Sequence, residues 1–243
     1  MTATGDPGPA DAAPAALAVL GLLANSDLAA VSRLAADADV APLVADRIEL
    51  CRLAGAAAER LTRVESRVAA LGAELTDVVA PFLGTFTDFD ARTPPGTWWE
   101  RLLKAHVGFG VEDDVARLLA RGLADGIDGT DGTDGTEGAD AATRALVLAV
   151  LEDDRHSALV IARVREATAA DPVLASRLAL WGRRLVGEAL GVVQRLVTDH
   201  PELRALLERA LADGPGEQPL QQRLFAVLTA EHTRRMDRLG LTA

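Results

Sequence analysis

Residues 14–37 read PAALAVLGLLANSDLAAVSRLAAD, a run in which apolar or small side chains recur every three or four positions. This spacing is typical of an amphipathic α-helix. One stripe of the helix passes through Leu20, Leu23, Asp27, Ala30 and Leu34. It therefore places an acid, Asp27, on the side that packs against other elements. The run decides the fold class because the same spacing returns along the rest of the chain.

Further helices are expected over residues 42–72, 75–83, 97–124, 141–168, 172–200, 202–212 and 218–239. The second of these carries a stripe predicted to face the core: Val44, Ile48, Cys51, Ala54, Leu61, Val64 and Val68. Thr97 and Glu100 have the spacing of a capping box. Asp171 stands directly before Pro172, an arrangement that starts a helix. Because no run alternates β-branched and polar residues, the chain is predicted to be all-α.

The expected organisation is a disordered tail over residues 1–11, a helical bundle over 12–200 and C-terminal helices over 201–243. Tandem Asp-Gly-Thr repeats at 125–140 predict a flexible acidic loop inserted in the bundle. These repeats lack the bidentate Glu that ends an EF-hand loop. Two alternatives stay open for the C-terminal helices, which either pack on the bundle or contact a partner, such as a second copy in a homodimer.

Charge and cysteine content limit the function classes. The 243 residues include 25 basic and 36 acidic side chains, a net charge of −11. That balance disfavours nucleic acid and anionic membranes as partners. Cys51 is the single cysteine, which excludes an intramolecular disulfide. The apolar stretch 12–24 is too short to span a bilayer, so we expect a cytoplasmic protein without membrane contact.

Polar residues inside the apolar stripes mark the candidate site. Asp114 lies in the packed stripe of the helix predicted over 97–124. Asp153 and His156 lie three positions apart in the stripe of the helix predicted over 141–168. Together with Asp27 they bring three acids and one imidazole from three helices into one core, which is the donor set of a carboxylate-bridged metal centre. The alternative is a hydrogen-bonded core histidine with acids at the solvent edge.

Several short motifs carry a resemblance to a known family. They are Arg33-Leu34-Ala35, Ala45-Asp46-Arg47, Ala80-Pro81-Phe82, Val107-Gly108-Phe109-Gly110 with Asp113-Asp114, Asp153-Asp154-Arg155-His156, and the segment from Leu180 to Leu190. Over residues 15–194 the chain resembles ferritin-like proteins similar to the tRNA isopentenyladenosine hydroxylase (MiaE-like). The resemblance implies a ferritin-like four-helix bundle that holds two irons. It assigns Asp27 and Asp114 as the single carboxylates, and Asp153 with His156 as an acid–histidine pair.

The chain departs from this family's pattern on its second helix. The resemblance places the other acid–histidine pair at Ala57 and Arg60, and neither residue can ligate iron. We therefore expect a degenerate di-iron site whose remaining acids and His156 are vestigial. The hypothesis is that Arg60 replaces the ion and neutralises Asp27, Asp114 or Asp153 through charge-assisted hydrogen bonds. In the alternative, the Arg60 side chain extends along its helix and ends in water.

Two functions follow from these alternatives. The first is a non-catalytic structural, regulatory or partner-binding protein without a cofactor. The second is an oxygen-activating hydroxylase with one or two iron ions on Asp27, Asp114, Asp153 and His156. The sequence identifies no small-molecule substrate for either one. Iron storage is disfavoured by the missing ligands on the second helix and by the extra C-terminal helices.

Overall fold

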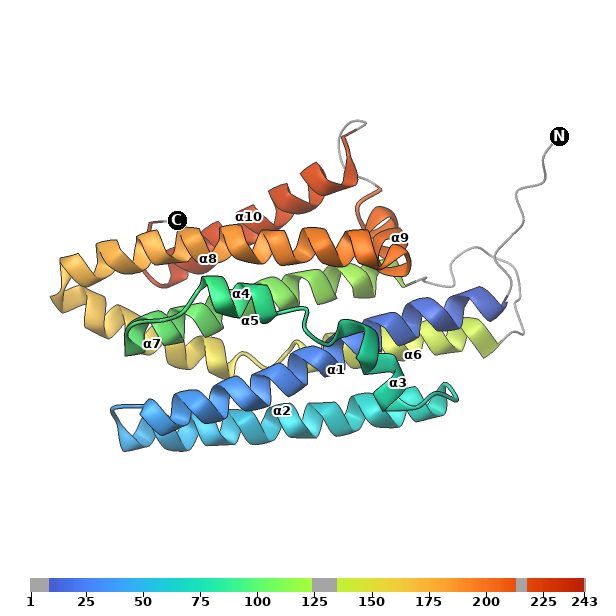
Figure 1. Ribbon diagram of the computed structural model, residues 1–243, viewed down its shortest axis with the longest axis horizontal. Coiled ribbons are helices and arrows are strands. Elements are labelled where there is room, and N and C mark those ends of the chain that lie inside the picture. Colours follow the sequence, from blue (N-terminus) through green and yellow to red (C-terminus); the bar gives the residue numbers. More distant parts are fainter. Residues whose placement is uncertain (1–8, 124–134, 213–217, 243) are drawn as a thin grey trace.

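The computed structural model describes residues 9–123, 135–212 and 218–242, and in these ranges every regular element is helical. A first pair of helices, α1 (Pro9–Val40) and α2 (Val44–Ala70), forms an antiparallel hairpin. In Figure 1 this hairpin lies along one side of an elongated molecule. The short elements α3 (Leu75–Val79) and η1 (Ala80–Phe82) pack against α1.

The centre of the molecule is α5 (Trp98–Gly122), which contacts α1 on one side and α8 (Pro172–Asp199) on the other. Two shorter helices, α6 (Gly135–Val150) and α7 (Arg155–Ala170), lie end to end beside α5. They also contact the α1–α2 hairpin, so α1, α2, α5 and the α6–α7 pair form a four-helix bundle. The all-α prediction is thereby confirmed.

Local signals explain where two long helices begin. The Thr97 side chain accepts a hydrogen bond from the Glu100 backbone N–H, and Glu100 Oε2 accepts one from the Thr97 N–H, so the predicted capping box is present. Asp171 accepts from the Leu174 N–H at 2.9 Å and caps α8, as expected.

Four predictions of where helices and loops lie along the chain were wrong. The helix predicted over 141–168 is interrupted at 151–154, between α6 and α7. The segment read as a polar crossing before Pro94 contains a short helix, α4 (Thr87–Arg92). Residues 9–11 of the expected tail are helical, as are 135–140 of the expected acidic loop, while 1–8 and 125–134 lie outside the described residues.

The predicted core stripe of α2 was wrong over its first two turns. Val44, Ile48 and Cys51 are exposed, whereas Leu50, Leu53 and Ala57 are buried against α1. The buried face also contains Asp46, whose Oδ1 accepts from Arg163 Nε on α7 at 2.8 Å. This ion pair fixes the start of α2 against α7, so the apolar side chains on the neighbouring face remain at the surface.

The helix from Pro14 to Val40 is long and apolar enough to cross a membrane, with a mean hydropathy of 1.6 over its best window, although its first apolar stretch alone is too short. In the fold, 61% of that window is buried against other helices. Such burial is the ordinary condition of a core helix in a helical bundle.

The C-terminal helices α9 (Pro201–Ala210) and α10 (Leu220–Arg238) pack on the bundle, and contact with a partner stays a prediction. Three glycines make this packing possible. A methyl group at Gly122 would lie 2.1 Å from the Leu206 backbone oxygen of α9. At Gly110 it would meet Arg235, and at Gly182 it would meet Met236, both on α10. The missing side chains therefore let these helices approach closely.

Candidate functional site

The first polar contact of the core joins α1 to α2. Arg60 Nε donates to Asp27 Oδ1 at 2.8 Å, and the Asp27 side chain is only 3% exposed. Above and below this pair along α1, Ala24 and Ala30 belong to separate apolar clusters. The pair is therefore a polar layer that interrupts the packed core, and Arg60 supplies the charge that neutralises the buried acid.

A second buried pair joins α5 to α10. Arg235 Nη2 donates to Asp114 Oδ2 at 2.6 Å, and Arg117 Nη1 lies 3.4 Å from the other oxygen of the same carboxylate. Arg235 reaches Asp114 by crossing the face of Gly110, where a Cβ would lie 2.0 Å from its Nε atom. Arg235 is not among the residues predicted from the sequence to belong to the site. The Gly108–Gly110 spacing was a signal for a close approach, although it does not identify what approaches.

In the structure, Asp153 and His156 do not lie on the same helix. Asp153 lies in the break between α6 and α7, and its carboxylate accepts two hydrogen bonds from the Arg155 guanidinium, at 2.9 and 2.6 Å. His156 is the second residue of α7, and its ring meets the Phe109 ring edge to face, with the ring centroids 5.0 Å apart. Arg60 Nη1 is 4.0 Å from Asp153 Oδ2. The expectation of an inward acid–histidine pair at helical spacing was therefore wrong.

Burial raises the pKa of several interior acids. It raises the pKa of Asp27 to about 6, although Arg60 partly opposes the shift. It also raises the pKa of Asp113 to about 6 and that of Glu112 to about 7. Arg33 Nη1 lies 3.6 Å from Glu112 and lowers the cost of ionising it. The interior thus favours the protonated form of these carboxyls, since low polarity penalises the charge.

Two interior histidines are held in the neutral form. Burial lowers the pKa of His156 to about 4 and that of His106 well below its ordinary value. His156, Arg235 and His232 lie near His106 and disfavour a further positive charge there. Both rings have an Nε2 atom without a hydrogen-bond partner among the described residues. Each is therefore available as one donor or acceptor at neutral pH.

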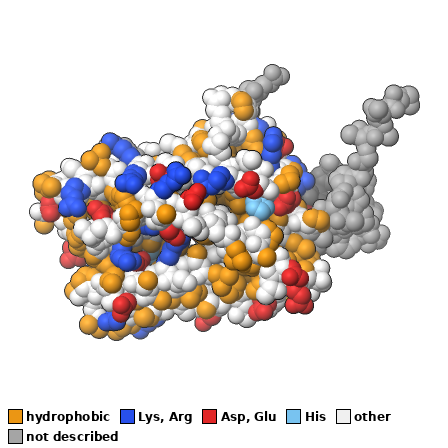
Figure 2. Space-filling view, in the orientation of Figure 1, with side chains coloured by type: hydrophobic (Ala, Val, Ile, Leu, Met, Phe, Trp, Pro, Cys, Tyr) orange, Lys and Arg blue, Asp and Glu red, His pale blue; other side chains and the backbone are white. Residues whose placement is uncertain are grey.

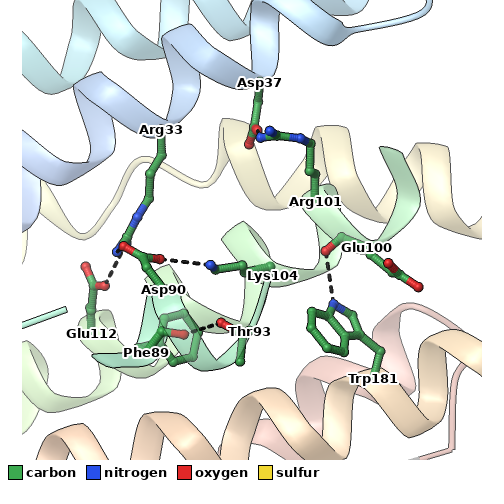
Figure 3. Close-up of polar contacts among 10 residues, drawn as sticks. All are labelled: Arg33, Asp37, Phe89, Asp90, Thr93, Glu100, Arg101, Lys104, Glu112 and Trp181. Carbon is green, nitrogen blue, oxygen red and sulfur yellow. Dashed lines mark hydrogen bonds and ion pairs between the residues drawn. The ribbon is translucent and has the colours of Figure 1, made fainter. Parts of the chain in front are cut away.

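A network of ion pairs fastens α4 over this region (Figure 3). Asp90 of α4 receives Arg33 Nη2 from α1 and Lys104 Nζ from α5, both at 2.9 Å. Next to it, Arg101 of α5 pairs with Asp37 of α1 at 2.6 Å. These contacts position Phe89, the buried aromatic residue of α4, against the helices beneath it.

The donor set does not fit a di-iron centre. Asp27 is bound by Arg60, Asp114 by Arg235 and Asp153 by Arg155, so a guanidinium stands beside each acid that the resemblance assigned to metal. Ala57, at the expected acid position of α2, is fully buried in an apolar cluster. Within residues 9–123, 135–212 and 218–242, no three His, Cys, Asp or Glu side chains are grouped as metal ligands would be.

Comparison with protein families agrees with this architecture. The model of a family described as "Ferritin-like domain, actinomycetes" matches residues 12–210. The chain belongs to this family. Among curated proteins, no sequence matches it. The match covers the bundle, α8 and α9.

Proposed function

We propose that this ferritin-like protein has a non-catalytic structural or regulatory role, and that arginine–carboxylate pairs have replaced the metal centre. The observation that carries the proposal is the 2.8 Å contact between Arg60 and Asp27. The resemblance noted in the sequence assigns a ligand histidine to the position of Arg60. A guanidinium brings a permanent positive charge and five donors, so it neutralises buried carboxylates without an ion.

The second guanidinium supports the same proposal. Arg235 comes from α10, which lies outside the matched region, and it binds the acid expected on the third bundle helix. Two carboxylates on two different helices are thus neutralised by two arginines from two others. An ion entering this site would have to displace both guanidinium groups and would meet no helix-two carboxylate or imidazole.

The ion pairs on the face shown in Figure 2 do not favour a nucleic-acid substrate. Figure 2 shows basic side chains gathered over α8 and α4 with acidic side chains beside them. Arg92 pairs with Glu188, Arg195 with Asp88 and Arg177 with Glu100, at 3.7, 3.6 and 3.4 Å. Paired arginines on a chain of net charge −11 are poor phosphate ligands, since binding would first require these pairs to break.

Metal analysis tests the proposal directly. The protein is expressed with added iron and, separately, with added manganese, and the bound metal is measured by mass spectrometry. We expect less than about one-tenth of an ion per chain, because each candidate acid already has an arginine partner. One or two ions per chain, lost in His156→Ala and retained in His200→Ala, would contradict the proposal and favour the oxygen-activating hydroxylase.

A further inference from the structure

A cavity of about 540 Å³ is lined by residues of α1, α2, α5, α6, α7, α8 and α10 and by Phe89 of α4. Its volume falls within the range of small-molecule sites. Three of the chain's five phenylalanines line it: Phe86, Phe89 and Phe109. These three side chains form the phenylalanine wall of the cavity, an apolar lining in a chain with only 3% aromatic residues.

The polar side of the cavity contains buried atoms that lack partners. His106 and Arg235 are 3% and 4% exposed, and His106 Nε2 and Arg235 Nη1 make no hydrogen bond to any described residue. The same holds for Asp27 Oδ2 and His156 Nε2. All four side chains line the cavity. A buried polar atom left unpaired costs about 1–3 kcal/mol, so a molecule that satisfies these atoms would be stabilised here.

The signs of the unpaired groups define the charge of the ligand. Asp27 offers an oxygen that accepts hydrogen bonds, and Arg235 offers an N–H that donates one. An anion would be repelled by the carboxylate and a cation by the guanidinium, whereas a neutral group with both a donor and an acceptor suits the two. The neutral imidazoles of His106 and His156 can each donate a hydrogen bond to the ligand or accept one from it.

We propose that this cavity binds a small uncharged aromatic molecule that carries a hydroxyl or amide group. The ring lies against the phenylalanine wall, and the polar group bonds to the unpaired atoms of His106, His156, Asp27 and Arg235. This inference rests on the proposed function, because it takes the buried carboxylates that line the cavity to be neutralised by arginines and not by a metal ion.

Three naphthalenes of similar size test the proposal on the full-length protein after chelator treatment. They are 2-naphthol, 2-naphthoate and 2-naphthylmethylamine, which are neutral, anionic and cationic at pH 7.5. Isothermal titration should show one site for 2-naphthol, with the two charged compounds at least tenfold weaker. Absence of 2-naphthol binding at 1 mM would overturn the proposal, and so would equal binding of all three.

Matched variants locate the site. His106→Leu should weaken 2-naphthol binding at least tenfold, whereas His200→Leu should leave it unchanged, because His200 stacks on Phe82 and does not line the cavity. If His106→Leu does not fold, His156→Leu makes the same comparison. Equal binding by the wild type and a folded cavity variant would overturn the proposal. Metal content is measured separately, so a metal-bound protein would contradict the proposed function without affecting this titration.

Discussion

Arg235 and Asp114 are separated by 121 residues in the sequence and joined by a 2.6 Å hydrogen bond in the interior. Both side chains are less than one-tenth exposed. The bond connects the C-terminal helix to the central helix of the bundle, next to a second arginine–carboxylate layer formed by Arg60 and Asp27. α10 is therefore part of the site, because it supplies the cation that binds the buried carboxylate of Asp114.

Arg60→Ala should destabilise the protein by about 3 kcal/mol, since it leaves the carboxyl of Asp27 buried without its cation. Urea unfolding monitored by circular dichroism measures the change. Arg52→Ala is the matched control on the same helix, because Arg52 is exposed and, among the described residues, its ion pair is with Glu49 one turn away. We expect the control to change stability by less than about 0.5 kcal/mol. A melting temperature within one degree of the wild type for Arg60→Ala would exclude a buried pair.

Gly110→Ala should also destabilise the folded protein, because the new methyl group would lie 2.0 Å from Arg235 Nε and force the guanidinium away from Asp114. We expect a loss of at least about 2 kcal/mol, measured by thermal unfolding. Gly187→Ala on α8 is the control. Nothing lies within 4 Å of its new methyl group, so it should stabilise by about 0.5–1 kcal/mol through helix propensity alone. Equal effects of the two substitutions would contradict the proposed packing of Arg235.

Glu112→Gln should become more stable than the wild type as the pH rises. The pKa of Glu112 is raised from 4.5 to about 7 in the folded protein, so the folded state holds its proton where the unfolded state has lost it. The favourable contribution of Glu112 is complete below pH 4.5 and is lost as the pH rises through 7. Over this pH range, the free energy of unfolding of the wild type should fall by about 3 kcal/mol relative to that of Glu112→Gln, since one pKa unit corresponds to about 1.4 kcal/mol.

Urea unfolding of both proteins between pH 4.5 and pH 8 measures this dependence. Glu166→Gln provides the control, because the Glu166 side chain is 76% exposed and should show no comparable trend. A constant difference between Glu112→Gln and the wild type across this range would show that the carboxyl of Glu112 is well solvated.

The Cys51 thiol should react with a disulfide reagent in the native protein as fast as in urea, because the side chain lies at the surface. The absorbance of the released thiolate measures the rate. The sequence-based stripe of α2 placed this residue in the core, and that register predicts a reaction limited by unfolding. A native rate many times slower than the rate in urea would favour the sequence-based register over the structural one.

Helix content and several helix starts could be predicted because they depend on neighbouring residues. The capping box of Thr97 and Glu100 and the Asp171 cap each join a side chain to a backbone N–H three positions away, a distance that the sequence displays directly. The position of Asp27 on the packed side of α1 follows from the same periodicity. The α2 register failed because Asp46 is buried by Arg163, 117 residues away, which periodicity cannot reveal.

The sequence by itself determined an all-α bundle with acids in its core and with no histidine on the second helix. Only the tertiary structure decided how those acids are neutralised. Arg235 reaches Asp114 because α10 packs across Gly110, and Asp153 leaves the interior because the chain breaks between α6 and α7. The physical reason is the sequence separation over which each interaction acts. Helix formation is set by contacts within one or two turns, whereas the partner of a buried charge is set by which helices pack together.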